Sequence, residues 1–391
     1  MDPVVIVNSK RTAVGSFQGS LSSLPAPKLG AHVIKNLLET THVKKEEIDE
    51  VIMGEVLTAG VGQAPARQAA LYAGLLHSTP CMTINKVCGS GLKAVMLAAD
   101  SIRLGQTQIA IAGGQESMSL APHLLENSRS GFRMGPATMT DSMIKDGLWD
   151  PYGNIHMGSL GDLCSKEFHF TREMQDQFTI ESYKMAQTAV EKGYFKNEIV
   201  PVAIESRKGT TVVEKDDEPF NTQFEKIPTL KPVFNKDGTI TAANASKVND
   251  GAAAHMLMSE KLAAQKGIKP LARIVAQATF AQDPNYFTTA PVGAIKKALN
   301  QVNLKVADIN LWEINEAFSV VTLVAMKQLE IPRDRVNVHG GAVSIGHPIG
   351  ASGARVLTTL VHGLHTHNKR YGLATLCIGG GEAVAVIIER I

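Results

Sequence analysis

The chain has 391 residues, of which 44% are hydrophobic and 19% charged, with a formal net charge of +2. This length suffices for two or three domains, and the nearly balanced charge does not favour nucleic-acid binding. No run of about 18 uncharged apolar residues occurs, so we expect no transmembrane helix and no membrane partner.

Short apolar runs alternate with longer periodic segments along most of the chain. In chain order they predict strands at 4–7, 50–56, 82–87, 108–112, 271–276, 311–314, 336–339, 374–378 and 383–388. Helices are predicted at 89–104, 171–192 and 351–364. Strands that alternate with helices indicate an α/β fold.

The middle of the chain has a different composition. Residues 119–245 are rich in Met, Gly, Pro, His and charge, yet they are too apolar for a disordered linker. We therefore expect a large insertion packed on the α/β body, with Thr171 as the cap of its one predicted helix. The body would comprise an N-terminal half (1–118 plus about 246–268) and a C-terminal half (269–391).

The two predicted halves contain similar sequence segments. The segment Ile109-Ala-Ile-Ala-Gly-Gly resembles Leu376-Cys-Ile-Gly-Gly. The strand–turn–helix unit around Cys88 likewise resembles the unit around His347. The same order in both halves suggests two copies of one α/β unit that face each other.

Among the four cysteines, Cys88 has the most distinctive surroundings. No two cysteines are spaced Cys-x-x-Cys, so neither a disulfide scaffold nor a zinc site is expected, and Cys81 and Cys164 are expected to be buried strand residues. Cys88 lies between a predicted strand and a predicted helix, in Asn85-Lys-Val-Cys-Gly-Ser-Gly-Leu. A helix start favours the thiolate. On this motif alone, a nucleophile and a structural cysteine are equally good interpretations.

Three further motifs carry residue types that acyl transfer uses. His347, in a glycine-rich loop, can take a proton from a thiol, or it can simply cap the loop. Cys377 ends a strand before Gly379, in a glycine run whose N–H groups can form an oxyanion hole, or it is a buried strand cysteine. Asn315 can hold a water or a carbonyl oxygen, or it can cap a helix.

Taken in order, these motifs resemble the signature of the thiolase superfamily: Cys88-Gly-Ser-Gly, Asn315-Glu-Ala-Phe, Gly346-His-Pro-Ile-Gly and Cys377-Ile-Gly-Gly-Gly. Gly113-Gly-Gln-Glu-Ser-Met, His156-Met-Gly and the Asn-Asp-Gly that ends at Gly251 extend the likeness over the whole chain and look like the short-chain biosynthetic branch. The resemblance implies the thiolase fold, with two similar α/β halves in a layered αβαβα arrangement and a large loop-domain insertion.

The resemblance also implies a reaction and a role for each residue. Cys88 would attack acetyl-CoA and carry the acetyl group, with His347 as its base. Cys377 would remove the α-proton of a second acetyl-CoA, and the products would be acetoacetyl-CoA and CoA. Asn315, through a water, would join His347 in one oxyanion hole, and the N–H groups of Cys88 and Gly379 would form the other. We expect no tightly bound cofactor, with coenzyme A as substrate and product.

By the same resemblance, coenzyme A would lie against the insertion. The matching positions are His156, Met157, Lys226, Ser246, Ala317 and Phe318. Three departures from the family pattern stand out. No arginine lies near Phe220, where relatives often place one by the nucleotide; Glu382 stands where Met or Gly is usual; and Lys247 stands where Gly or Thr is common.

Mitochondrial-type relatives bind a potassium ion near coenzyme A. The corresponding ligands here would be Tyr183, Ala242, Ala243, Ala245 and Val343. Tyr183 fits a helix-face aromatic residue nearly as well.

The resemblance bears on assembly, and the chain start bears on location. Family members are dimers or tetramers, so we expect a homotetramer, a dimer of dimers, with the insertion supplying the tetramer contact. The chain begins MDPVVIV, which leads almost directly into a strand-like run, so we expect a cytoplasmic protein. A mitochondrial matrix protein whose presequence had been removed would look the same.

Three other functions remain open on the sequence alone. The nearest alternative within the family is a degradative 3-ketoacyl-CoA thiolase, which would accept longer acyl chains. A ketoacyl synthase pairs cysteine with two histidines, whereas this chain offers Asn315 and Cys377. A non-catalytic lipid carrier on the same fold is disfavoured by the complete catalytic set.

Overall fold

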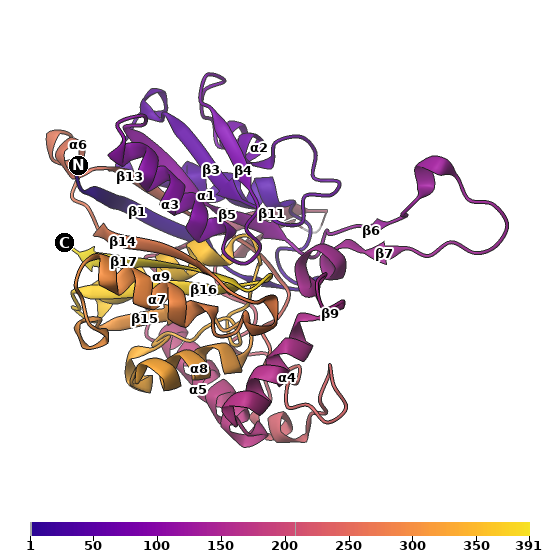
Figure 1. Cartoon of the computed structure of the whole chain (residues 1–391). Coiled ribbons are helices and arrows are strands. Elements are labelled where there is room, and N and C mark those ends of the chain that lie inside the picture. The colour runs from indigo at the N-terminus through magenta and orange to yellow at the C-terminus, as the bar shows by residue number, and fades with distance from the viewer. Residues whose placement is uncertain (1, 208) are drawn as a thin grey trace.

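The computed structural model describes residues 2–207 and 209–391 and centres on one mixed sheet (Figure 1). The strands of this sheet are β1 (Val4–Thr12), β2 (Gly15–Ser16), β3 (Glu50–Gly54), β4 (Cys81–Ile84), β5 (Ile109–Ser117), β10 (Ile199–Val200), β13 (Asn249–Ser259), β14 (Ala272–Ala281), β15 (Leu311–Ile314), β16 (Tyr371–Ile378) and β17 (Glu382–Arg390). The helices of the body are α1 (Ala26–Thr41), α2 (Pro65–Tyr72), α3 (Ser90–Arg103), α6 (Glu260–Gln265), α7 (Ala290–Gln301), α8 (Ser319–Leu329) and α9 (Ser352–Thr366).

The sheet and its helices form five layers. α1 packs on β1, β5 and β13, and α7 packs on β14, β16 and β17. α3 and α9 lie between the two sets of strands and contact each other, within one core that draws on both halves. The two sets of strands join only where β1 pairs with β14 over Val4–Ile6. This arrangement confirms the predicted αβαβα layers.

Both halves have the same strand order, and this order explains one wrong prediction. β1-β13-β5-β3-β4 corresponds to β14-β17-β16-β15, with Val336 in the place of β4 through a single bridge to Trp312. The predicted strand at 336–339 does not form. Asn337 has a φ of +47°, and its side chain replaces the backbone ladder. Its Oδ1 accepts the N–H of Ile314 at 2.9 Å, and its Nδ2 donates to the Ile314 carbonyl at 2.8 Å.

The other predicted strands and helices are present, but the sequence patterns missed β13. This strand pairs with both β1 and β5 and is buried almost throughout. Its residues, NDGAAAHMLMS, include no β-branched side chain and show no alternation. α1, α2, α7 and α8 were also not predicted.

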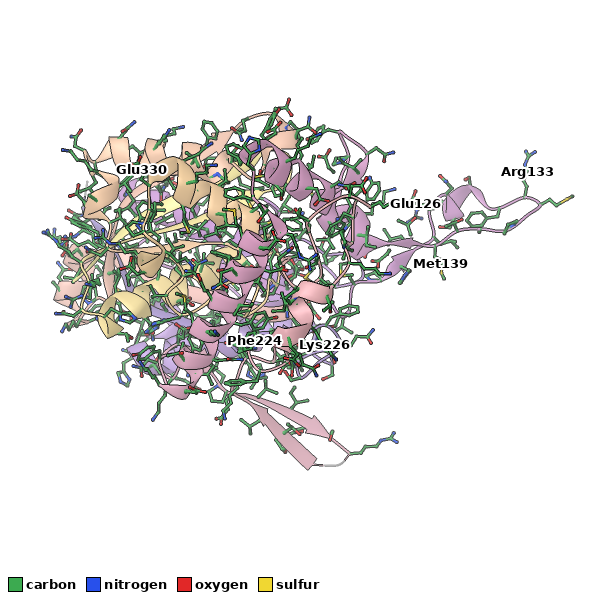
Figure 2. All side chains as sticks on the ribbon, turned by 90° about the horizontal axis from the view of Figure 1, so that it is seen from below. Glu126, Arg133, Met139, Phe224, Lys226 and Glu330 are labelled. Carbon is green, nitrogen blue, oxygen red and sulfur yellow. The ribbon has the colours of Figure 1, made fainter. Side chains whose placement is uncertain are left out.

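The segment 119–245 leaves the body in two directions (Figures 1 and 2). A long hairpin, based on β6 (His123–Leu124) and β7 (Thr140–Asp141), extends far from the sheet. After the short pair β8 (Trp149–Asp150) and β9 (Ile155–His156), α4 (Met157–Phe168) and α5 (Arg172–Glu191) pack against α8. Thr171 caps α5 as predicted, by accepting the Met174 N–H at 3.3 Å. β11 (Val202–Ser206) and β12 (Gly209–Val213) form a small second hairpin.

Across the described residues, no helix is both long enough and apolar enough to span a membrane.

Candidate active site

Cys88 lies in a tight turn between β4 and α3. Val87, directly before it, has a φ of +44°, which a β-branched residue rarely adopts and which often marks a functional turn. Ser90 fixes this turn, because its hydroxyl accepts the N–H of Lys86 at 2.8 Å and donates to the Val87 carbonyl at 2.7 Å. The turn therefore holds the half-buried Cys88 at the start of α3.

The surroundings of Cys88 favour the thiol over the thiolate. Burial raises the pKa of Cys88 to about 11, although the backbone N–H groups of Gly379 and of Cys88 itself act in the opposite direction. The helix-start argument for a thiolate is therefore wrong for the substrate-free protein, because desolvation outweighs these donors. Cys88 needs a base to become a nucleophile.

His347 has the properties of that base. The Ser352 hydroxyl donates to the Pro348 carbonyl at 2.9 Å, so it must accept a hydrogen bond from Nδ1 of His347 at 2.5 Å. This arrangement places the proton on Nδ1 and leaves a lone pair on Nε2. Nε2 is buried and has no partner within the described part of the chain. Burial, and then the charge of Arg355, lower the pKa of His347 to about 3, so the ring is neutral.

Asn315 and Cys377 come from two neighbouring strands of the C-terminal half. Asn315 directly follows β15, and both polar atoms of its side chain are buried without a partner among the described residues. Cys377 lies near the end of β16 and is fully buried. Burial, and then the charge of Cys88, raise the pKa of Cys377 well above its usual value. The two cysteines, which come from opposite halves, therefore lie close enough to interact electrostatically.

Cys164 is a third cysteine near this site, and the sequence motifs did not single it out. It shares a buried cluster with Met157 and Cys377, and its charge also raises the pKa of Cys377. Cys164 lies in α4, whereas we expected a strand. Cys81 does begin a strand, but it is half-buried and not fully buried.

Two of the family-like motifs fix the loop that carries His347. Asn249, in the Asn-Asp-Gly motif, accepts the His347 N–H on Oδ1 at 2.8 Å. Glu116, in the Gly-Gly-Gln-Glu motif, accepts the Gly350 N–H at 2.8 Å. Both acceptors are completely buried. These motifs therefore position His347 by holding its loop.

Most of the predicted coenzyme A residues cluster beside the cysteines. His156 stacks on Phe234 with ring centroids 4.4 Å apart, and Phe318 meets Phe234 edge-on at 6.2 Å. The Met157 methyl carbon lies 3.8 Å from where a Cβ atom on Gly379 would be.

Two more of the predicted coenzyme A residues, Ser246 and Ala317, are hydrogen-bonded to each other, whereas Lys226 has separate surroundings. Ser246 donates its N–H to the Ala317 carbonyl at 2.9 Å. The sixth, Lys226, is exposed on a 3₁₀ helix, Phe224–Thr229 (Figure 2).

The carbonyl oxygens of Ala242, Ala243 and Ala245 do converge, but on a lysine. The Lys247 ammonium donates to Ala242 at 2.7 Å and to Ala245 at 3.2 Å, and it contacts Ala243 at 3.4 Å. Burial lowers the pKa of Lys247 to about 8, against the opposing charge of Glu218. These carbonyls therefore do not fit a potassium ion, because an ammonium group already occupies the position between them.

The other two predicted potassium ligands have separate surroundings. The Tyr183 hydroxyl is hydrogen-bonded to Thr222, and its ring meets Phe224 edge-on at 6.3 Å. Val343 is buried, and its N–H donates to Glu316 at 3.1 Å.

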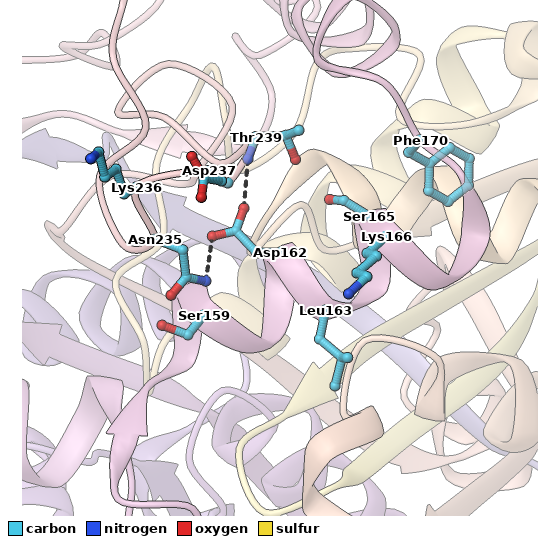
Figure 3. A pocket seen from close by; sticks show the side chains of 11 residues that line it. Ser159, Asp162, Leu163, Ser165, Lys166, Phe170, Asn235, Lys236, Asp237 and Thr239 are labelled. Carbon is cyan, nitrogen blue, oxygen red and sulfur yellow. Dashed lines mark hydrogen bonds between the residues drawn. The ribbon is translucent and has the colours of Figure 1, made fainter.

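A separate hollow lies between α4 and the loop 235–239 (Figure 3). On its wall, Asp162 accepts the side-chain amide of Asn235 at 2.8 Å and the N–H of Thr239 at 2.7 Å. None of its lining residues is a predicted catalytic or coenzyme A residue. These bonds anchor the segment that leads directly into the carbonyl loop at Ala242.

Comparison with known proteins agrees with this fold. Residues 4–261 match the thiolase N-terminal domain, and residues 268–390 match the thiolase C-terminal domain. The chain is 53% identical to "Acetyl-CoA acetyltransferase" of Cupriavidus necator over the full length of both, and 49% identical to "Acetyl-CoA acetyltransferase, mitochondrial" of Rattus norvegicus, covering 100% of this chain and 92% of that protein. The crystal structure of the Bacillus anthracis acetyl-CoA acetyltransferase superposes with a TM-score of 0.98 at 39% identity, covering 100% of this chain and 99% of that one.

The fold is thus that of a thiolase. The chain belongs to the thiolase family.

Proposed function

We propose that this protein is an acetyl-CoA C-acetyltransferase. It condenses two molecules of acetyl-CoA reversibly to acetoacetyl-CoA and CoA, through an acetyl-cysteine intermediate. The observation that carries the proposal is the contact between the segments of Cys88 and Cys377, which come from opposite halves: a Cβ atom on Gly89 would lie 2.4 Å from the Ile378 side chain. The full-length likeness to proteins named acetyl-CoA acetyltransferase supports it.

The first half of the reaction transfers an acetyl group to Cys88. Nε2 of His347 accepts the thiol proton, because it is the unpartnered ring nitrogen. The thiolate attacks the thioester carbon, and the carbon–sulfur bond to CoA breaks. The proton then passes from His347 to the leaving CoA sulfur, so the histidine returns to its neutral state.

The second half forms the new carbon–carbon bond. Cys377 first passes its thiol proton to Nε2 of His347, and its thiolate then removes the α-proton of a second acetyl-CoA. The enolate carbon attacks the acetyl group on Cys88, and the bond to Cys88 breaks. The protonated His347 returns its proton to the released thiolate, so that both cysteines end as thiols. Two cysteines are needed because acyl carriage and proton removal are separate steps.

Two sets of donors stabilise the negative oxygens. The N–H groups of Cys88 and Gly379 already act together on the Cys88 sulfur, and they are suited to bind the oxygen that forms on the acetyl group. Asn315, through a water, and His347 bind the enolate oxygen, and their unpartnered polar atoms support this role.

The segment 119–245 acts, in this proposal, as a loop domain between two catalytic halves, 1–118 with about 246–268 and 269–391. Coenzyme A lies against His156, Met157 and Phe318, whose aromatic and thioether side chains form an apolar wall beside Gly379. Lys226 is the exposed cation of this set and supplies positive charge for the nucleotide phosphates.

The assembly we propose is a homotetramer, a dimer of dimers. The hairpin between β6 and β7 carries apolar side chains into solvent, with Phe132 and Met139 exposed and Met134 fully so (Figure 2). Such side chains on a projecting arm fit contact with other copies. β4 is an open edge of the sheet with Met82 exposed, a further surface suited to pairing. Light scattering of the Phe132→Asp, Met134→Asp double variant should report a species smaller than the wild type.

The cellular location that we propose is the cytoplasm, with the mitochondrial matrix as the alternative. The named rat relative is mitochondrial. Cell fractionation distinguishes the two.

Substrate length separates this proposal from its nearest rival, a long-chain thiolase. We expect thiolysis of acetoacetyl-CoA to exceed that of 3-ketohexadecanoyl-CoA by at least about a hundredfold in kcat/KM, a discrimination within the range that differences in acyl size can produce. Equal values, or a preference for the long chain, would reject the short-chain assignment.

A further inference from the structure

The loop 241–247 is folded so that its N–H groups turn inward. The Thr241 N–H donates to Asn244 Oδ1 at 2.8 Å, and the Ala245 N–H donates to the Thr241 carbonyl at 3.1 Å. The Ala243 N–H donates to the Thr241 hydroxyl at 3.2 Å. These bonds leave the carbonyl oxygens of Ala242, Ala243 and Ala245 to find a donor elsewhere.

The side chain of Lys247 supplies that donor. Its ammonium has three N–H groups, and it lies at 2.7, 3.2 and 3.4 Å from the carbonyl oxygens of Ala242, Ala245 and Ala243. Rings of backbone carbonyls of this kind are the groups that replace the hydration shell of a monovalent cation. An ammonium group carries the same single charge as potassium and is of similar size.

We infer that Lys247 is a built-in cation, which occupies the carbonyl cage of Ala242, Ala243 and Ala245 and makes the protein independent of bound potassium. The ion is thereby replaced by a side chain that is covalently part of the loop and cannot dissociate.

The cage stabilises a loop that adjoins the coenzyme A site, so this inference rests on the proposed function for its kinetic consequence. The Ser246 N–H donates to the Ala317 carbonyl at 2.9 Å, and the Ser319 N–H donates to the Asn244 carbonyl at 2.8 Å. The loop is thus tied to the start of α8. Loss of the cation should loosen the loop and weaken the binding of CoA substrates, while the chemical step at Cys88 is affected little.

A different role for Lys247 would be to bind a phosphate group of coenzyme A. The observed contacts favour the cage, because the ammonium already directs its donors at three carbonyl oxygens. A phosphate would have to draw it out of these contacts. The two roles differ in one measurable respect, since a free potassium ion can fill an empty cage but cannot replace a phosphate ligand.

Two substitutions make this difference visible. Lys247→Ala removes the ammonium and leaves space for an ion beside the carbonyls, whereas Lys247→Met removes the charge but keeps the space filled. Lys296→Ala, on the exposed face of α7, is the matched control for loss of a lysine. Melting temperature, kcat and the KM for acetyl-CoA are measured in potassium, ammonium, sodium and choline chlorides at equal ionic strength.

The wild type and Lys296→Ala should behave identically in all four salts. In choline, both Lys247 variants should melt about 2 °C or more below the wild type, with a KM raised at least about tenfold, the scale of one lost hydrogen bond to a charged group. Potassium and ammonium should restore Lys247→Ala in both readouts, sodium less so, and none should restore Lys247→Met.

Three results would overturn the inference. They are a wild type that melts higher or binds better in potassium than in choline, a Lys247→Ala variant with unchanged melting temperature and KM, and a Lys247→Ala variant that is impaired but not restored by potassium or ammonium. The last result would instead indicate the phosphate-binding role. Melting temperature does not depend on catalysis, so these outcomes are distinct from a wild type that lacks acetyl transfer, which would reject the proposed function.

Discussion

The N-terminal and C-terminal halves share one scaffold but use it differently. In each half, a turn or loop leads into a central helix, after β4 in the first half and after the single bridge at Val336 in the second. The two helices, α3 and α9, pack against each other. The turn before α3 carries Cys88, and the loop before α9 carries His347. The symmetry therefore brings two helix starts together. In the proposed mechanism, the different loops before them supply the nucleophile on one side and the base on the other.

The glycines of the two halves show the same contrast. A Cβ atom on Gly114 in β5 would lie 2.2 Å from the Gly350 carbonyl oxygen, so this glycine allows two backbones to pack closely. The nearest atoms that a Cβ atom on Gly379 would meet belong to Val87 and Met157, at 3.7 Å or more. Similar sequence motifs thus serve packing in the first half and line the site in the second.

The largest predicted effect is a difference between Cys88 and Cys377 in their rates of alkylation by iodoacetamide. The pKa of Cys88 is raised to about 11, and the thiolate is the reactive form, so its alkylation rate should rise about tenfold per pH unit from pH 7 to 10. Cys377 is fully buried and should react far more slowly. Peptide mapping by mass spectrometry measures both rates. A plateau for Cys88 below pH 9, or earlier labelling of Cys377, would contradict this account.

The next prediction compares the effects of replacing Asn315 and Glu55, the residues that directly follow β15 and β3. The Asn315 side chain has no hydrogen-bond partner among the described residues. Asn315→Ala should therefore lower kcat about a hundredfold, as for a lost oxyanion donor, with little change in melting temperature. Glu55, the matching residue after β3, accepts the Gln115 amide at 2.7 Å. Glu55→Ala should therefore lower the melting temperature more than Asn315→Ala does. A lower melting temperature for Asn315→Ala than for Glu55→Ala would contradict this prediction.

The glycine contrast gives a third prediction, for stability. Gly114→Ala places a methyl group against backbone that cannot move freely, and it should destabilise the fold by about 3 kcal/mol. Gly379→Ala should leave unfolding by urea almost unchanged and lower only the rate of condensation. If both variants unfold at the same urea concentration, the two glycine motifs do not differ as proposed.

The smallest effect concerns the ion pair that joins the two halves at the site. Lys86, in the turn of Cys88, pairs with Glu382 after the glycine run. Because both side chains are partly exposed to solvent, Glu382→Gln should cost less than about 1 kcal/mol of stability. Any difference from the wild type in kcat should shrink at high ionic strength. A large loss of activity that persists in high salt would assign Glu382 a direct role.

The fold was largely predictable from periodic patterns, and its exceptions have local causes. The helical spacing of the apolar residues indicated α3, α5 and α9. β13 lacks a periodic signal, since a strand buried on both faces needs no alternation. A strand at 336–339 was predicted from its apolar residues. In the structure, the side chain of Asn337 makes the hydrogen bonds to Ile314 in β15 that the backbone of such a strand would have made.

Sequence motifs proposed the residues of the candidate site, but they did not predict its electrostatics. Motif order pointed to Cys88, Asn315, His347 and Cys377, yet the sequence indicated a thiolate where burial favours the thiol. The position of the Lys247 ammonium depends on three carbonyl oxygens of its own loop. Such contacts depend on backbone conformation, which residue types do not specify.

The most direct test of the division of labour between the halves is the mass of the intact protein after incubation with labelled acetyl-CoA. The wild type and Cys377→Ala should both gain one acetyl group, and only the wild type should go on to form acetoacetyl-CoA. Cys88→Ala should gain none. An acetyl group on Cys88→Ala, or condensation by Cys377→Ala at the wild-type rate, would contradict the assignment of acyl carriage to Cys88 and proton removal to Cys377.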